Sequence, residues 1–333
     1  MHRASIIIPV KNCESTIADL LSSITSLDYP KDLVEVILVD GGSTDRTIDI
    51  ASRYPVEIIE EPGLGPGYGR MVGVKHSRGD ILAFTDGDCI VSSKWLKAIS
   101  RDLEDSSIGC VGGSILLDRR YSVGFSARYF EESIIRVMPL SRERRIYDKL
   151  LPFKHLAFAN LATRRDILEA LGGIDTEFRT FEDMDLLQRI CDHGYKILFD
   201  PDVYVWHRHR QSIGGLLKQV YRYGSGGPRF RRKHPRSMIT RWYRIGLILF
   251  YTILSAISTS IALSSFYGSL PVVIASLPII LGYTGDAIYY LRKTKSTVKS
   301  TVYPILDIAM IISFCLGDTA SNLKSVLHRG SKA

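Results

Sequence analysis

Residues 81–89, ILAFTDGDC, decide the fold class, because an apolar run leads straight into two aspartates separated by one glycine. The apolar run predicts a strand that is covered on both faces, as in a parallel sheet. Asp86 and Asp88 would then leave the carboxyl edge of that sheet, where open α/β sheets bind their ligands. Two such carboxylates can hold a divalent cation, and the cation can hold a diphosphate. The alternative interpretation is an ordinary solvated turn.

The first 115 residues alternate between strand and helix patterns. Helices are expected at about 15–27, 44–54 and 92–104, and strands at 5–10, 35–39, 56–59, 81–85 and 108–115. Such alternation predicts an α/β, Rossmann-like domain with a mostly parallel sheet and helices on both of its faces. Globular patterning resumes between residues 155 and 206, so we expect this domain to occupy residues 1–230.

The net charge of +8 is concentrated in one part of the chain. Seven cations precede a long apolar run, at Arg229, Arg231, Arg232, Lys233, Arg236, Arg241 and Arg244. Their position favours a membrane surface over nucleic acid as the partner. The five cysteines are scattered without metal-type spacing, which is typical of reduced thiols in a cytoplasmic domain.

Three apolar runs follow the basic segment 231–244, at about 245–266, 269–291 and 302–323. A bilayer crossing needs roughly 20 apolar residues, so residues 245–325 are expected to form a membrane domain with three transmembrane helices. Basic flanks before the first run and after the second place the α/β domain on the cytoplasmic face. A third crossing would leave the basic tail around Lys324 outside, a conflict that an interfacial helix would avoid.

Further carboxylates lie where the sheet is expected to end or a helix to begin. Asp40 closes the second strand in VDGGSTD and could accept a hydrogen bond from a nucleotide base, and Glu14 follows the first strand. Glu182 and Asp183 open a predicted helix, where acids favour the positive end of the helix dipole. Asp183 could instead take a proton from an acceptor hydroxyl.

The remaining candidates are polar residues later in the chain. Asn160, in FANLATRR, is expected near the same region. Either His207 or His209, after a strand in VYVWHRHR, could supply a third protein ligand to the metal, and His207 is the candidate chosen. Gln219, Arg222 and Tyr223 are spaced to share one face of a helix. An amphipathic helix lying on the membrane explains the same spacing.

Taken in order, these segments resemble family 2 glycosyltransferases of the GT-A fold. SIIIPVKN looks like the first strand of that family, and VDGGSTD looks like its nucleotide-binding second strand, although Gly41 stands where the family often has another aspartate. GYGRMVGV looks like a degenerate form of the Ala-Arg-Asn segment of that family, in which only Arg70 matches. QVYRY is similar to the Gln-x-x-Arg-Trp motif of cellulose-synthase-like members, with Tyr223 replacing the tryptophan.

The resemblance implies a role for each matching residue. It implies catalysis by Asp183 with Glu182, and a divalent cation, Mn²⁺ or Mg²⁺, held by Asp86, Asp88 and His207. It implies that the nucleotide sugar is bound by Pro9, Glu14, Asp40, Arg70, Asp86 and Asp88. Binding of the acceptor or its phosphate is implied for Asn160, Gln219, Arg222 and Tyr223.

The apolar runs look like those of membrane enzymes that glycosylate polyprenyl lipids, such as dolichyl-phosphate mannosyltransferases. The expected activity is an inverting, metal-dependent transfer of a sugar, with GDP-mannose favoured as donor, to a polyprenyl (dolichyl) phosphate-linked lipid in N-glycan biosynthesis. A processive polysaccharide synthase that uses a UDP-sugar is the main alternative. A sugar nucleotidyltransferase and a non-enzymatic membrane scaffold are two others.

Overall fold

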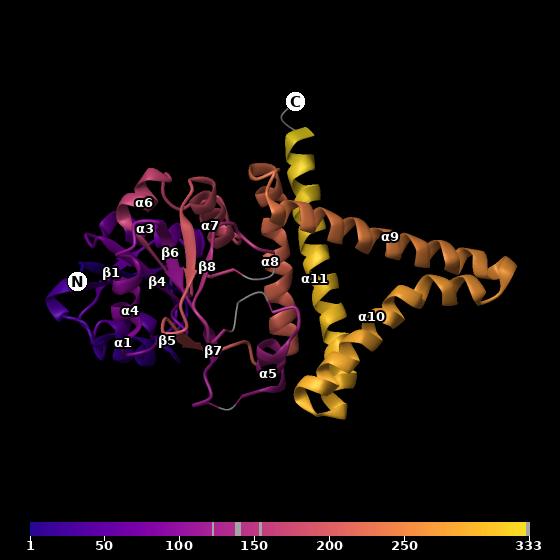
Figure 1. Ribbon diagram of the computed structural model, residues 1–333, viewed down its shortest axis with the longest axis horizontal. Coiled ribbons are helices and arrows are strands. Elements are labelled where there is room, and N and C mark those ends of the chain that lie inside the picture. Colours follow the sequence, from indigo (N-terminus) through magenta and orange to yellow (C-terminus); the bar gives the residue numbers. More distant parts are fainter. Residues whose placement is uncertain (122, 137–140, 153–154, 331–333) are drawn as a thin grey trace. The chain divides into compact units, whose positions relative to one another are not determined.

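The computed structural model describes residues 1–121, 123–136, 141–152 and 155–330 (Figure 1). The chain forms two compact units. The first comprises Met1–Glu131 and Val137–Arg210, and the second comprises Glu132–Arg136 and Gln211–Ala333.

The first unit is built around an eight-stranded sheet with the strand order β3-β2-β1-β4-β9-β6-β10-β8. Neighbouring strands β3, β2, β1 and β4 are parallel, as are β6 and β10, whereas β9 and β8 run antiparallel to their neighbours. The sheet is therefore mostly parallel, as the sequence predicts. Its strands are β1 (Ala4–Val10), β2 (Val34–Asp40), β3 (Glu57–Glu60), β4 (Ile81–Thr85), β6 (Ile108–Gly112), β8 (Arg145–Tyr147), β9 (Asn160–Arg164) and β10 (Lys196–Phe199).

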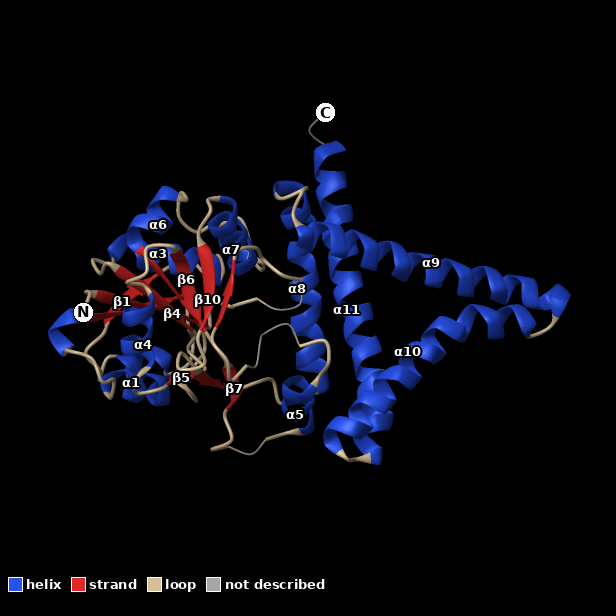
Figure 2. Cartoon of the chain, viewed as in Figure 1, coloured by secondary structure: helices blue, strands red, loops and turns tan. Residues whose placement is uncertain are grey.

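Helices cover the sheet (Figure 2), and all five residues of β4 are buried beneath them. Helix α3 packs closely on β1, because a Cβ atom at Gly73 would lie only 2.5 Å from the Cγ2 of Ile7. The helices of this unit are α1 (Ile17–Thr25), η1 (Lys31–Leu33), α2 (Thr47–Ala51), α3 (Pro66–His76), α4 (Trp95–Asp102), α5 (Phe125–Glu132, whose last residue belongs to the second unit), α6 (Arg165–Ala170) and α7 (Glu182–Asp192).

A second, three-stranded sheet has the order β5-β11-β7. Its strands are β5 (Cys89–Val91), β7 (Ile115–Leu117) and β11 (Val205–His207). Strand β11 pairs antiparallel with β5, and the register sets His207 opposite Cys89. This small sheet brings a histidine from the end of the unit to the segment that directly follows β4.

Asn160 ties the two sheets together from inside the core. It stands opposite Thr85 at the end of β4 and is completely buried. Its Oδ1 accepts a hydrogen bond of 2.8 Å from the indole of Trp95, and its Nδ2 donates to the carbonyls of Ser114 and Val203. The sequence analysis expected Asn160 to contact an acceptor. In the structure both the oxygen and the nitrogen of its amide bind groups of the core instead.

The second unit consists mainly of four helices, α8 (Ile213–Lys233), α9 (Met238–Tyr267), α10 (Leu270–Thr294) and α11 (Thr297–Gly330). Helices α9, α10 and α11 are each long and apolar enough to cross a membrane. The short segment Glu132–Arg136 packs with them: Ser133 donates to Asp307 at 2.9 Å, and the hydroxyl of Tyr290 donates to the same carboxylate at 2.6 Å.

We predict that Asn160→Ala lowers the free energy of unfolding of the first unit by about 3 kcal/mol or more, because three buried polar groups lose their partner. Thermal denaturation in detergent, followed by circular dichroism, measures the change. Gln188→Ala, which removes an amide on the outer part of α7, is the matched control and should shift the midpoint far less. Equal shifts for both variants would contradict the role assigned to Asn160.

Candidate functional site

The candidate site lies at the carboxyl edge of β1, β2 and β4. These strands are adjacent and parallel, with Val10 paired to Asp40 and Ile7 paired to Phe84, so their ends meet at one edge of the sheet. Asp40 is the last residue of β2, and Asp86 and Asp88 follow β4 directly. The sheet thus collects carboxylates from two separate loops, as the sequence predicts for an open α/β fold.

The loops after β1 and β2 are joined by hydrogen bonds. The side chain of Asn12 accepts from the backbone N–H of Thr44 at 2.8 Å, and the N–H of Cys13 donates to the hydroxyl of Thr47 at 2.7 Å. Asp40 is buried and accepts from the N–H of Ser43 at 3.0 Å. Glu14 accepts from the N–H of Arg46 at 3.2 Å. Both predicted donor-binding carboxylates therefore order these loops.

Arg70 links two of the predicted motifs. Its guanidinium lies 2.7 Å from Asp86 Oδ1 and 2.8 Å from Glu182 Oε1, and only 4% of its side chain is exposed. The same group sits over the ring of Phe158, 4.5 Å from its centroid. Arg70 thus holds the start of α7 against the loop after β4. The resemblance had assigned Arg70 to the nucleotide sugar, but here its terminal nitrogens contact carboxylates.

Glu182 and Asp183 occupy the first turn of α7, behind Phe181 in a left-handed conformation with φ of 75°. The N–H of Met184 donates to Asp183 at 2.8 Å. Burial raises the pKa of Glu182 to about 7 and that of Asp183 to about 6, although the charge of Arg70 opposes both shifts. A carboxyl with a pKa near 6 can accept a proton at neutral pH and still be a stronger base than an exposed aspartate.

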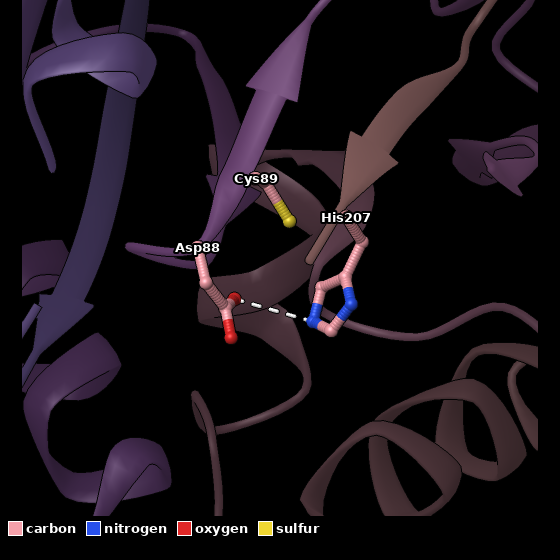
Figure 3. Close-up of side chains that lie close together, drawn as sticks. All are labelled: Asp88, Cys89 and His207. Atoms are coloured by element: carbon pink, nitrogen blue, oxygen red, sulfur yellow. Dashed lines mark ion pairs between the residues drawn. The ribbon is translucent and has the colours of Figure 1, made fainter. Parts of the chain in front are cut away.

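Asp88 and His207 approach each other where β5 pairs with β11 (Figure 3). Asp88 Oδ1 lies 3.2 Å from His207 Nε2. Burial alone would raise the pKa of Asp88, but His207 outweighs it and the pKa is lowered. Burial alone would lower the pKa of His207, but Asp88 outweighs it and the pKa is raised. Each member of the pair therefore favours the charged form of the other.

The donor set around this pair fits a divalent cation. One ligand atom each from Asp88, Cys89 and His207 lie within 4.8 Å of one another. Carboxylate and imidazole ligands suit cations such as Mn²⁺. Burial raises the pKa of the Cys89 thiol far above its ordinary value, so the thiol stays protonated and is a poor ligand. The sequence pattern had not singled out Cys89, and only the register of the small sheet reveals its position.

The metal ligands proposed from the sequence are only partly brought together. Asp88 and His207 meet, whereas Asp86 forms its ion pair with Arg70. The other nitrogen of His207, Nδ1, is 2.9 Å from His209 Nδ1, so one of these nitrogens donates and the other accepts. Pro9 lies on β1, half-buried, next to the edge where the carboxylates gather.

Gln219, Arg222 and Tyr223 belong to α8 in the second unit. Gln219 Nε2 donates to the hydroxyl of Tyr223 at 2.8 Å. The two side chains therefore share a helix face, as their spacing predicts. Their role toward an acceptor stays a prediction.

Comparison with known proteins finds a match to the family model of glycosyl transferase family 2 over residues 5–172. Glycosyltransferase AglE of Haloferax volcanii is 32% identical over 229 residues, which cover 67% of this chain and 72% of that protein. A dolichyl N-acetyl-alpha-D-glucosaminyl phosphate 3-beta-D-2,3-diacetamido-2,3-dideoxy-beta-D-glucuronosyltransferase of Methanococcus voltae is 26% identical, covering 68% and 73%. Some other relatives are longer, and the match covers only about half of their length.

The structure is similar to that of mannosyltransferase PcManGT from Pyrobaculum calidifontis, solved with GDP-Man and Mn²⁺. The TM-score is 0.66 with 21% sequence identity, and the match covers 96% of this chain and 87% of the other. This similarity confirms the predicted fold, a GT-A domain followed by helices that could span a membrane.

Removing the charge of Arg70 should destabilise the protein in a pH-dependent way. In Arg70→Met, Asp86 and Glu182 lose their counter-charge, which costs on the order of 3 kcal/mol near neutral pH. The folded pKa of Glu182 already lies above its unfolded value, so ionisation of Glu182 weakens folding as the pH rises from about 4.5 to about 7. Without Arg70 that loss should become larger and extend to higher pH.

Thermal midpoints of the parent and of Arg70→Met, measured from about pH 5 to 8, test this expectation. Glu182→Gln added to Arg70→Met should recover part of the lost stability near neutral pH. Parallel pH profiles for the parent and the single variant would show that Arg70 does not neutralise these carboxylates.

Mn²⁺ binding should depend on pH, because the metal and a proton compete for the ring nitrogen of His207. Affinity should fall by about tenfold per pH unit once the pH drops below the raised pKa of His207. Calorimetric titration with Mn²⁺ measures this. His207→Asn should bind weakly at every pH, whereas His193→Asn, at an exposed histidine after α7, should behave like the parent. Binding by the parent that is independent of pH would contradict the assignment.

Proposed function

The chain belongs to glycosyl transferase family 2, and from that premise we propose that it transfers a sugar from a nucleotide-sugar donor to a polyprenyl-phosphate-linked lipid. The observation that carries the proposal is the pairing of Asp88 with His207 beyond β4, in a chain with three helices apolar enough to cross a membrane. A soluble acceptor would not require such helices. We further propose that the first unit faces the cytoplasm, because cations flank α9 and α10 on that side.

We propose GDP-mannose as the donor and a dolichyl-type lipid as the acceptor. The donor is supported by the bound GDP-Man in the similar structure of PcManGT. The acceptor class is supported by the name of the Methanococcus voltae relative, which acts on a dolichyl-linked sugar phosphate. A processive synthase that uses a UDP-sugar would instead make a long water-soluble product, so product length separates the two functions.

The proposed chemistry is a single displacement with inversion at the anomeric carbon. The bond from the acceptor oxygen to the anomeric carbon forms as the bond to the nucleoside diphosphate breaks. Asp88 and His207 would hold a divalent cation, which when bound neutralises the diphosphate and makes it a better leaving group. Asp183 takes the proton of an acceptor hydroxyl, and Arg70 keeps α7 in place through Glu182.

Transfer from radiolabelled GDP-mannose to dolichyl phosphate and to dolichyl-linked sugars, in detergent with Mn²⁺ or with EDTA, tests the proposed function. Label should enter the organic phase only with Mn²⁺, and Asp88→Asn should abolish most of the transfer. The same assay with radiolabelled UDP-glucose and UDP-N-acetylglucosamine provides the comparison, and both should transfer less label than GDP-mannose. Metal-independent transfer, or label in a long water-soluble product, would overturn the proposal.

The effect of Asp183→Asn should reveal the acceptor group. With a hydroxyl acceptor, kcat should fall by about 10²–10⁴-fold, the usual contribution of a general base. The parent should gain activity as the pH rises through about 6, where Asp183 loses its proton. A phosphate acceptor with a second pKa near ~6 is already an anion and needs no base. Asp192→Asn, farther along α7, is the control and should change neither the rate nor the profile.

A further inference from the structure

Helices α8 and α11 lie side by side and in parallel within the second unit (Figure 1). Glycines let their backbones touch. A Cβ atom at Gly224 would lie 2.0 Å from the carbonyl of Phe314, and one at Gly317 would lie 2.0 Å from the carbonyl of Tyr221. The hydroxyl of Ser313 donates to the carbonyl of Leu217 at 2.8 Å. From residue 313 onward, α11 therefore packs directly on α8, and the two helices must lie at the same depth relative to a membrane.

Helix α8 cannot lie in the hydrocarbon of a bilayer. Its 21 residues include six cations and no acid, namely Lys218, Arg222, Arg229, Arg231, Arg232 and Lys233. Charged side chains are costly inside a membrane unless they face a polar interior. Arg231 lies 2.5 and 2.8 Å from the two carboxylate oxygens of Asp318, which is almost fully buried. This ion pair holds α11 next to the charged helix α8, outside the hydrocarbon of the bilayer.

Helix α11 also lies across the base of the hairpin that α9 and α10 form. In the first half of α9, the ring of Tyr243 is 5.6 Å from that of Phe314, and Tyr251 hydrogen-bonds Thr319. Near the middle of α10, Tyr283 donates to the carbonyl of Thr301 at 3.0 Å. In Figure 2 the rest of the hairpin extends away from α11. These contacts involve the first half of α9 and the middle of α10, and none of them lies near the α9–α10 turn.

Helix α11 has an exposed apolar face and an opposite face that is buried against protein. Six of its eight exposed large apolar residues recur at intervals of seven or four and so share one face, Val298, Ile305, Ile312, Leu316, Leu323 and Leu327. Asp307 and Asp318 are buried on the opposite face. In the most apolar window of α11, 39% of the residues are buried within the protein, against 6% in α9 and 0% in α10. A continuous apolar stripe opposite a polar face is typical of a helix in the membrane interface.

We propose that only α9 and α10 cross the bilayer, and that α11 lies with α8 in the headgroup region of the leaflet from which the chain enters α9. The apolar stripe of α11 then faces the acyl chains, while Asp307 and Asp318 face protein. The sequence expectation of three crossings would place Lys324 on the far side, whereas this arrangement keeps it beside the other cations. The inference does not depend on the donor or the acceptor.

The location of the C-terminus tests the proposal. Full-length versions carry a protease site and an epitope tag before Met1, at the α9–α10 turn beside Gly268, or after Ala333. In sealed vesicles that leave the first tag accessible, we expect the tag after Ala333 to be cleaved with it and the tag at Gly268 to be protected. Protection of the tag after Ala333 together with that at Gly268 would establish three crossings and overturn the proposal.

A depth series then tests whether α11 lies in the plane of the membrane. Spin labels at cysteines replacing Ile305, Ile312, Leu316 and Leu323 span about 27 Å along the helix axis. Accessibility to oxygen and to a nickel complex should place all four at one shallow depth. Labels replacing Val273, Ile280 and Ile288 on α10 form the matched crossing series. The partly exposed Cys13 and Cys191 are replaced by Ser throughout. Depths along α11 that pass through the bilayer centre would overturn the proposal.

Discussion

The ion pairs of Arg70 are the interaction on which the candidate site depends. Three segments far apart in the sequence, α3, the loop after β4 and the start of α7, meet at this guanidinium. Without a counter-charge, the half-buried carboxylate of Asp86 and the buried carboxylate of Glu182 would repel each other. Arg70 makes their approach possible, and its stacking on Phe158 sets its direction. Because Asp86 lies in the loop after β4 and Glu182 in the first turn of α7, this one side chain connects two separate elements of the site.

The second constraint is the register of the small sheet. Strand β11 contributes only three residues, yet its antiparallel pairing with β5 determines which residue faces Asp88. A shift by one residue would turn Trp206 instead of His207 toward this position, since neighbouring side chains in a strand point to opposite faces. The chemistry of the site therefore rests on a pairing whose length and position no local sequence preference dictates.

The sequence predicts the parallel strands β1, β2 and β4 because they are apolar runs ending in polar residues, but it does not predict the antiparallel strands β8 and β9. Residues 81–85 and 5–10 are such runs, and β4 and β1 lie there. It also predicts that Asp88 and His207 meet. It does not reveal that Arg70 binds carboxylates or that Asn160 belongs to the core, because both depend on partners at least 16 residues away. Apolar composition alone does not distinguish α11 from α9 and α10, since the differences lie in the neighbours that bury one face of α11.

The hydrogen bonds between the loops after β1 and β2 have a consequence for specificity. Asn12, Cys13 and Glu14 each bond to the segment 44–47, so neither loop can rearrange by itself. A ligand that binds a wall already ordered loses little conformational entropy on that wall, and affinity benefits from this pre-organisation. The same stiffness limits evolution and engineering. A change of nucleotide preference would require matched substitutions in both loops, because a single one would break the contacts that shape the other.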